Sequence, residues 1–109
     1  MSLLLPDWPA PANVKAILTT REGGKSSAPY DSFNLSLNVE DQSEDVLRNR
    51  EMLCTQIAEL HAQVPSFFWL NQVHGTAVCE LNAAEQVLED ADAAYTRRSQ
   101  LACGITTAD

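Results

Sequence analysis

Hydrophobic residues are grouped along the chain in short runs that predict β-strands. Residues 14–20 are apolar and rich in β-branched side chains, and residues 67–73 form the most apolar stretch. Residues 76–81 and the apolar run that begins at Leu101 have the same character. Residues 33–39 alternate apolar with polar side chains, which is the period of a half-buried strand or extended segment. The pattern therefore predicts several short strands.

A longer period, that of an α-helix, runs from residue 43 to residue 61. Its apolar stripe consists of Val46, Leu53, Ile57 and Leu60. Asp41 and Glu44 have the spacing of a capping box at the start of this helix, and Val64-Pro65 ends it. A second helix-prone stretch covers residues 83–90.

Alternating strands and helices predict a mixed α/β or α+β fold. The length of 109 residues suits one domain, and the hydrophobic fraction of 45% is typical of a globular chain. Residues 21–30 and 97–100 have the composition of loops and turns. Gly75 directly follows a histidine inside a strand pattern, which indicates a bulge or a close backbone approach.

The charge of the chain narrows its possible partners. Fifteen acidic and seven basic residues give a net charge of −8, which repels a phosphate backbone or an anionic lipid surface. No apolar run approaches the roughly 20 residues that cross a bilayer, and the N-terminus lacks the pattern of a signal peptide. Three cysteines without a C-x-x-C pair fit a reducing compartment. We therefore expect a cytoplasmic protein that binds neither nucleic acid nor membrane.

His74 is the leading candidate for chemistry. A histidine at the end of a strand, beside a glycine, is suited to act as a metal ligand or general base. A histidine satisfied within a sheet is the alternative. His61 lies at the predicted C-terminal end of the helix, where the helix dipole favours an imidazolium, and a structural role is expected for it.

The cysteines do not complete a metal site with His74. Cys79 lies five residues further on, and an odd offset along an extended strand points its side chain to the opposite face unless a bulge intervenes. Cys54 and Cys103 are expected to behave as small apolar residues. One credible ligand remains, whereas a catalytic zinc site commonly has three protein ligands.

The loop that begins at Thr19 is a second candidate site. Gly23 and Gly24 would allow close backbone approach to an anion, and Arg21 could donate two hydrogen bonds to a phosphate or carboxylate. The loop does not match a P-loop, and a plain turn with a surface arginine is the alternative.

Several short motifs, taken in order, resemble the laccase-domain family, also called multicopper polyphenol oxidase or YfiH-like. The motifs are Thr20-Arg21-x-Gly23-Gly24, Pro29-Tyr30, Asn34-Leu35, Asn49-Arg50, Trp69-Leu70-x-Gln72-Val73-His74-Gly75, Ala91-Asp92-Ala93 and Thr107-Ala108-Asp109. The resemblance implies the N-terminal part of a YfiH-like layered α-β-β-α sandwich. It also implies a zinc-dependent purine nucleoside phosphorylase and adenosine deaminase, with a possible role in peptidoglycan editing.

The family's zinc ligands are the histidine of Gln-Val-His-Gly, the cysteine that follows Thr-Ala-Asp, and a histidine of a later His-Ala-Gly-Trp-Arg motif. His74 matches the first ligand, and the second would directly follow Asp109. The resemblance therefore implies that residues 1–109 are the N-terminal part of a single laccase-type domain, truncated before the second metal ligand.

The resemblance also implies roles for other motif positions. Gln72 and Asn34 would orient polar groups, Arg21 would contact phosphate or substrate, and Asp109 would accept a hydrogen bond beside the metal ligands. The small-molecule partners would be a purine nucleoside and phosphate.

Two other functions remain open. A copper-dependent polyphenol oxidase needs many imidazoles, often in close pairs, and this chain has two histidines, so zinc suits it better than copper. The chain could also be a non-catalytic fragment or binding module that buries an open sheet edge against a partner.

The 109-residue polypeptide alone is expected to be inactive with adenosine and inosine, because it supplies one of the three implied zinc ligands. An assay of the purified polypeptide for phosphorolysis and deamination tests this expectation. Measurable turnover of either nucleoside would contradict it.

Overall fold

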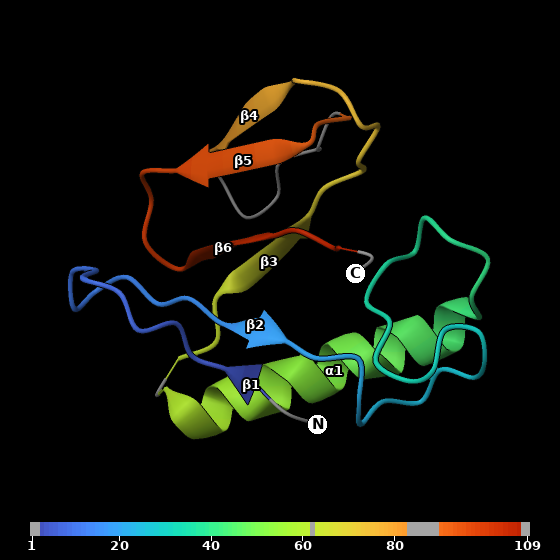
Figure 1. The fold of residues 1–109 in the computed structure, drawn as a ribbon. Helices are drawn as coiled ribbons and strands as arrows, with labels where there is room; N and C mark the ends of the chain where they lie inside the picture. The colour runs from blue at the N-terminus through green and yellow to red at the C-terminus, as the bar shows by residue number, and fades with distance from the viewer. Residues whose placement is uncertain (1–2, 62, 83–89, 108–109) are drawn as a thin grey trace. The chain divides into compact units, whose positions relative to one another are not determined.

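The computed structural model describes residues 3–61, 63–82 and 90–107, and the chain divides into two units, Met1–Leu53 and Cys54–Asp109. Figure 1 shows the order of the elements along the chain. They are β1 (Leu3–Leu4), β2 (Leu18–Thr19), α1 (Ser43–Leu60), β3 (Ser66–Trp69), β4 (Val78–Leu81), β5 (Ala93–Thr96) and β6 (Leu101–Gly104). The mixed helix and strand content that the sequence predicts is confirmed.

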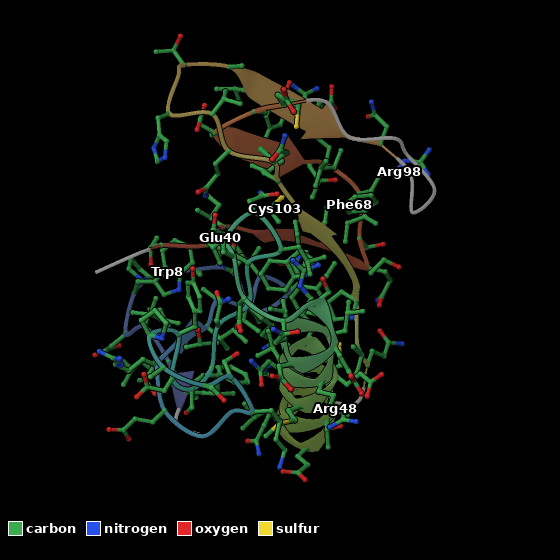
Figure 2. All side chains as sticks on the ribbon, turned by 90° about the vertical axis from the view of Figure 1, so that its right-hand side faces the viewer. Trp8, Glu40, Arg48, Phe68, Arg98 and Cys103 are labelled. Carbon is green, nitrogen blue, oxygen red and sulfur yellow. The ribbon has the colours of Figure 1, made fainter. Side chains whose placement is uncertain are left out.

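The described strands form three two-stranded sheets (Figure 1). In the first unit β1 pairs with β2 in antiparallel fashion. In the second unit β3 pairs with β6 and β4 pairs with β5, both in parallel. Cys103 lies opposite Phe68 in the β3–β6 register, and Figure 2 labels both residues on these neighbouring strands. Because isolated two-stranded ribbons are marginally stable, other interactions must hold each unit together.

The helix is where the sequence predicts it. Val46, Leu53 and Ile57 of its apolar stripe are buried, whereas Leu60 in the last turn is exposed. Arg48 on the polar side of α1, labelled in Figure 2, forms an exposed ion pair with Glu44 one turn earlier. None of the helical structure in the described residues is long and apolar enough to span a bilayer.

The predicted capping box is wrong. The Gln42 carbonyl accepts the first helical hydrogen bond, from the Val46 amide, so Gln42 is the N-cap residue. The Asp41 carboxylate instead accepts hydrogen bonds from the Gln42 amide and from the Asn34 side chain. Glu44 is the partner of Arg48 and does not reach back to the cap.

Two of the predicted strands of the first unit differ from the structure. Residues 14–20 contribute only the two residues of β2, and residues 33–39 form no strand but consist of turn, irregular and bend backbone. Phe33 and Leu35 are buried as the alternation indicated, but Leu37 and Val39 are 44% and 43% exposed. The alternation therefore indicated correctly that two side chains are buried, but the segment pairs with no neighbouring strand.

A buried asparagine on α1 organises this irregular segment. The Asn49 side chain is completely buried and accepts a hydrogen bond from the Lys25 amide at 2.8 Å. Its Nδ2 donates to the Asn34 carbonyl at 2.8 Å and also to the Ser26 hydroxyl and the Ser32 carbonyl. These bonds satisfy backbone groups that have no ladder to join.

Arg50, the next residue of α1, binds the same segment. Its Nε and Nη2 donate to the Leu35 carbonyl at 2.9 Å and 2.7 Å. Burial lowers the pKa of this guanidinium from its ordinary value, although the group remains protonated. The side chains of Asn49 and Arg50 thus bind backbone groups of residues 25–35, a segment that forms no strand.

The strands of the second unit are shorter than the apolar runs that predicted them. Residues 67–73 contribute β3, which ends at Trp69, and residues 76–81 contribute β4, which begins at Val78. The apolar run from Leu101 forms β6, and residues 97–100 form the predicted turn. The pattern missed β5, and most of the predicted 83–90 helix lies outside the described residues.

Strands β3 and β6 pack closely where the side chain of Trp69 lies against the backbone of Gly104. Phe67 and Trp69 stack with ring centroids 5.6 Å apart. Gly104 lies opposite Trp69, and a Cβ at this glycine would be 2.8 Å from Trp69 Cε3. The absence of a side chain at position 104 therefore makes room for the indole.

Replacing Asn49 by alanine is expected to destabilise the chain by about 2–4 kcal/mol, because several buried polar groups lose their partner together. Urea unfolding followed by circular dichroism measures this change. Asn38→Ala, which truncates an exposed asparagine, is the control and should change stability by less than about 0.5 kcal/mol. Equal effects of the two substitutions would contradict the role assigned to Asn49.

Candidate functional site

His74 lies in the loop between β3 and β4, on a backbone of unusual conformation. Its φ angle is 59°, in the left-handed region that residues other than glycine rarely adopt. Residues 73–75, here named the His74 turn, direct three successive backbone amides toward one point. This arrangement is a backbone nest, a concave site that binds anions.

The anion in this nest is the carboxylate of Asp92. Asp92 Oδ1 accepts hydrogen bonds from the Val73 amide at 3.0 Å and the His74 amide at 2.7 Å. Asp92 Oδ2 accepts a third from the Gly75 amide at 2.7 Å. The pKa of Asp92 is lowered from its ordinary value, and the hydrogen bond from the Gly75 amide is the largest cause. Burial acts in the opposite direction and raises the pKa. The hydrogen bonds from the His74 and Val73 amides and the charge of His74 lower it further.

Backbone bonds join the same two segments on either side of the nest. The Asp92 amide donates to the Ala77 carbonyl at 3.0 Å, and the Ala91 amide donates to the Asn71 carbonyl at 3.1 Å. The Asn71 side chain also donates to the Asp90 carboxylate. The chain on both sides of the His74 turn, at Asn71 and at Ala77, is therefore also joined to residues 90–92.

Gly75 has a different role from the one its position suggested. A Cβ at Gly75 would lie 3.5 Å from Asp92 Oδ2 and 3.8 Å from Val73 Cγ2, which is ordinary van der Waals contact. The left-handed residue of this turn is His74. Steric constraints of the turn therefore do not require a glycine at position 75.

The imidazole of His74 is available to a ligand. The side chain is exposed, and it forms no hydrogen bond to any residue that the structure describes. Within residues 3–61, 63–82 and 90–107, no three His, Cys, Asp or Glu side chains lie close enough together to hold a metal. The described residues thus supply no complete metal site around His74.

The cysteines remain outside the site, but the parity argument for Cys79 was wrong. It assumed a continuous strand from His74, whereas residues 74–77 form a loop before β4. None of the three cysteines forms a disulfide within the described residues. Burial raises the pKa of Cys103, and the nearby Cys79 adds to the effect.

Gln72 is part of the fold around the same loop. Its Nε2 donates to the Thr106 carbonyl at 2.9 Å and so joins the end of β3 to the segment after β6. The bond fixes the chain two residues before His74. Asp109, the other candidate of this unit, lies outside the described residues.

Arg21 and Asn34 belong to the first unit. Arg21 is 75% exposed, and its Nε and Nη2 both donate to the Asp31 carbonyl, at 3.1 Å and 2.9 Å. The neighbouring Gly24 allows the same loop to pack closely, because a Cβ at this position would be 2.7 Å from both Asn49 Oδ1 and Phe33 Cα. The backbone at Gly24 is therefore approached closely by other atoms of the protein, whereas an anion was predicted there.

Asn34 uses its whole side-chain amide inside the protein. Its Nδ2 donates to the Ser36 carbonyl and, at 3.0 Å, to Asp41 Oδ2, and its Oδ1 accepts from the Ser36 amide. These bonds form an Asx turn that holds the loop before α1. They favour a structural role.

Sequence reasoning missed the role of Asp92. The residue lies in the Ala91-Asp92-Ala93 motif, but its contacts join residues 17 to 19 positions apart. The available signal was an isolated aspartate between alanines at the start of a strand, which is too common to indicate a nest.

The fold and this loop define a mixed helix and strand protein that presents an exposed histidine on a hydrogen-bonded backbone turn. Residues 15–109 match the family model described as multi-copper polyphenol oxidoreductase laccase. The chain belongs to this family, as its motifs predicted.

Similar proteins carry the name of a nucleoside enzyme. The chain is 48% identical over 106 residues to a purine nucleoside phosphorylase of Pseudomonas aeruginosa and 43% identical over 109 residues to one of Haemophilus influenzae. These alignments cover 97% and 100% of this chain, and 40% and 43% of the relatives. The chain thus spans less than half the length of either relative.

Two solved structures share the fold. A Neisseria meningitidis protein described as DUF152 superposes with a TM-score of 0.83 at 43% identity, covering 98% of this chain and 42% of that protein. YlmD from Geobacillus stearothermophilus superposes with a TM-score of 0.76 at 28% identity, covering 90% of this chain and 38% of YlmD. The YfiH-like fold implied by the motifs is confirmed.

The carboxylate of Asp41 predicts a pH dependence of stability. Burial alone would raise its pKa, but hydrogen bonds from Ser26, Asn34 and the Gln42 amide lower it below the ordinary 3.8. Ionised Asp41 therefore stabilises the folded chain at pH values above its unfolded pKa. This stabilisation is lost as the pH falls through the lowered pKa.

The expected result is a stability difference between the parent chain and Asp41→Asn that is constant down to about pH 4 and shrinks below it. Urea unfolding at a series of pH values measures the difference. Asp45→Asn removes the same charge from the first turn of α1 and is the control. A difference that grows on acidification would contradict the assignment.

Proposed function

We propose that this chain supplies the zinc ligand His74 to a purine nucleoside phosphorylase that also deaminates adenosine. The observation that supports the proposal is the exposed imidazole on a turn whose three amides are bound by Asp92. The similar proteins of P. aeruginosa and H. influenzae carry the phosphorylase name. Zinc and the deaminase activity rest on the family resemblance together with this loop.

The chemistry of the donor fits zinc. A neutral imidazole nitrogen is a good ligand for this metal, and both nitrogens of His74 are free of described hydrogen-bond partners. The family's cysteine and second histidine would provide the remaining ligands. Bound zinc would polarise the substrate or lower the pKa of a water molecule to about 7.

The chain's own residues would hold and orient the reactants around this ligand. Gln72 fixes the backbone before the His74 turn through its bond to Thr106. The exposed guanidinium of Arg21 is a candidate contact for phosphate, and its bonds to Asp31 would orient it. Asn34 and Asp109 remain candidates for an orienting group and for an acceptor beside the metal ligands.

Copper oxidation is a weaker proposal for the same loop. A multicopper centre requires several imidazoles, often in close pairs, and the two histidines of residues 1–109, His61 and His74, are 13 positions apart in the sequence. We also propose a cytoplasmic location, and the lack of a disulfide among the three cysteines in the described residues supports it.

The His74→Ala substitution in the complete gene product tests the proposal. We expect loss of bound zinc and a fall of at least about 100-fold in inosine phosphorolysis and adenosine deamination, because even groups outside the ligand set change metal affinity or activity 10- to 100-fold. Elemental analysis and a nucleoside assay measure both.

His61→Ala, which removes the imidazole that follows α1, is the matched control and should retain zinc and activity. Zinc content that is unchanged in His74→Ala would exclude the histidine as a ligand. An active metal-free protein would exclude the zinc-dependent reaction itself.

A further inference from the structure

The nest around Asp92 joins distant parts of the second unit at the candidate ligand. Asp92 is 17 to 19 residues from the amides it binds, and its two carboxylate oxygens accept all three bonds at 2.7–3.0 Å. The middle amide of the three is that of His74 itself. The residue's own amide returns a bond to the Ala77 carbonyl, so Asp92 contacts the loop on both sides of His74.

We propose that Asp92 is a positioning residue for His74. By binding the amides of the His74 turn, its carboxylate holds the backbone in the left-handed conformation and so presents the imidazole to a metal in one orientation. This inference rests on the proposed function, in which His74 binds zinc.

The arrangement requires an acceptor with two oxygens at this place. Three N–H groups that converge on one point favour an anion, and the left-handed φ of His74 needs compensating contacts because a residue with a side chain disfavours it. An asparagine at position 92 keeps the shape but directs an NH₂ group at one of these donors. The turn would then lose at least one bond and be free to relax.

Neighbouring groups do not supply the same interaction. Asp90 is exposed and accepts from the Asn71 side chain, two residues before the turn. Asp90→Asn therefore makes the same change of charge on the same segment without removing an acceptor from the His74 turn. It is the matched control for Asp92→Asn.

The first measurement is amide hydrogen exchange by NMR in the metal-free complete gene product. In the parent protein the amides of His74 and Gly75 are expected to exchange at least about 10-fold more slowly than unstructured amides of the same sequence. This arm needs no variant, so it does not depend on whether Asp92→Asn folds. Exchange at the unstructured rate would overturn the proposal.

The second measurement is zinc affinity by competition with a chelator. Asp92→Asn is expected to bind zinc about 10- to 100-fold more weakly than the parent, as is typical when a group that orients a metal ligand is lost, with both amides exchanging faster. Asp90→Asn should match the parent. Asp92→Glu, which retains the charge on a longer side chain, should recover part of the lost affinity.

Zinc affinity in Asp92→Asn equal to that of the parent would overturn the positioning role, whatever the amides do. Failure of the proposed function is seen separately, since His74→Ala would then bind zinc as tightly as the parent. Weaker zinc binding in both His74→Ala and Asp92→Asn, with Asp90→Asn unchanged, supports both statements.

Discussion

The carboxylate of Asp92, bound by three consecutive amides, is the interaction on which the candidate site depends. It satisfies backbone donors of a loop that has no strand to pair with, and it does so at the residue that carries the exposed imidazole. The hydrogen bond of Gln72 to Thr106 and the backbone bonds of residues 91 and 92 extend this connection on both sides. In the proposed function, a zinc ligand held in this way would need little reorganisation when the metal binds.

The same principle organises the first unit. There the buried Asn49 and the adjacent Arg50 bind the backbone of residues 25–35 from α1. Both units contain only two-stranded sheets among their described residues, and such sheets are marginal by themselves. Bonds from side chains to the backbone therefore supply much of the order that wider sheets supply elsewhere.

The parts of the fold that the sequence predicts are those with local causes. The period of α1 and the apolar runs of β3, β4 and β6 depend on neighbouring residues, and these elements are observed. The alternation at residues 33–39 misled because burial of Phe33 and Leu35 has the same pattern with or without a paired strand. β5 was missed because the four-residue segment Ala93–Thr96 is short and begins with two alanines, which are weak strand formers.

In the candidate site too, the sequence predicts what has a local cause and misses what depends on distant contacts. His74 could be found from its motif and its adjacent glycine, since both are local. The positive φ of His74 and the role of Asp92 depend on a contact across the fold, and no spacing rule encodes it. Arg21 was singled out by residue type and Asn34 by its motif, yet their bonds to Asp31, Ser36 and Asp41 show that polar loop residues also stabilise the fold.

In the proposed site, a carboxylate-bound turn presents His74 to zinc. A crystal structure of the complete gene product with zinc, with anomalous data at the zinc edge, would show whether it does. We expect a zinc peak about 2.0–2.1 Å from an imidazole nitrogen of His74, with the Asp92 carboxylate on the three amides of residues 73–75. A zinc ion bound elsewhere, with His74 turned away from it, would exclude this role of the turn.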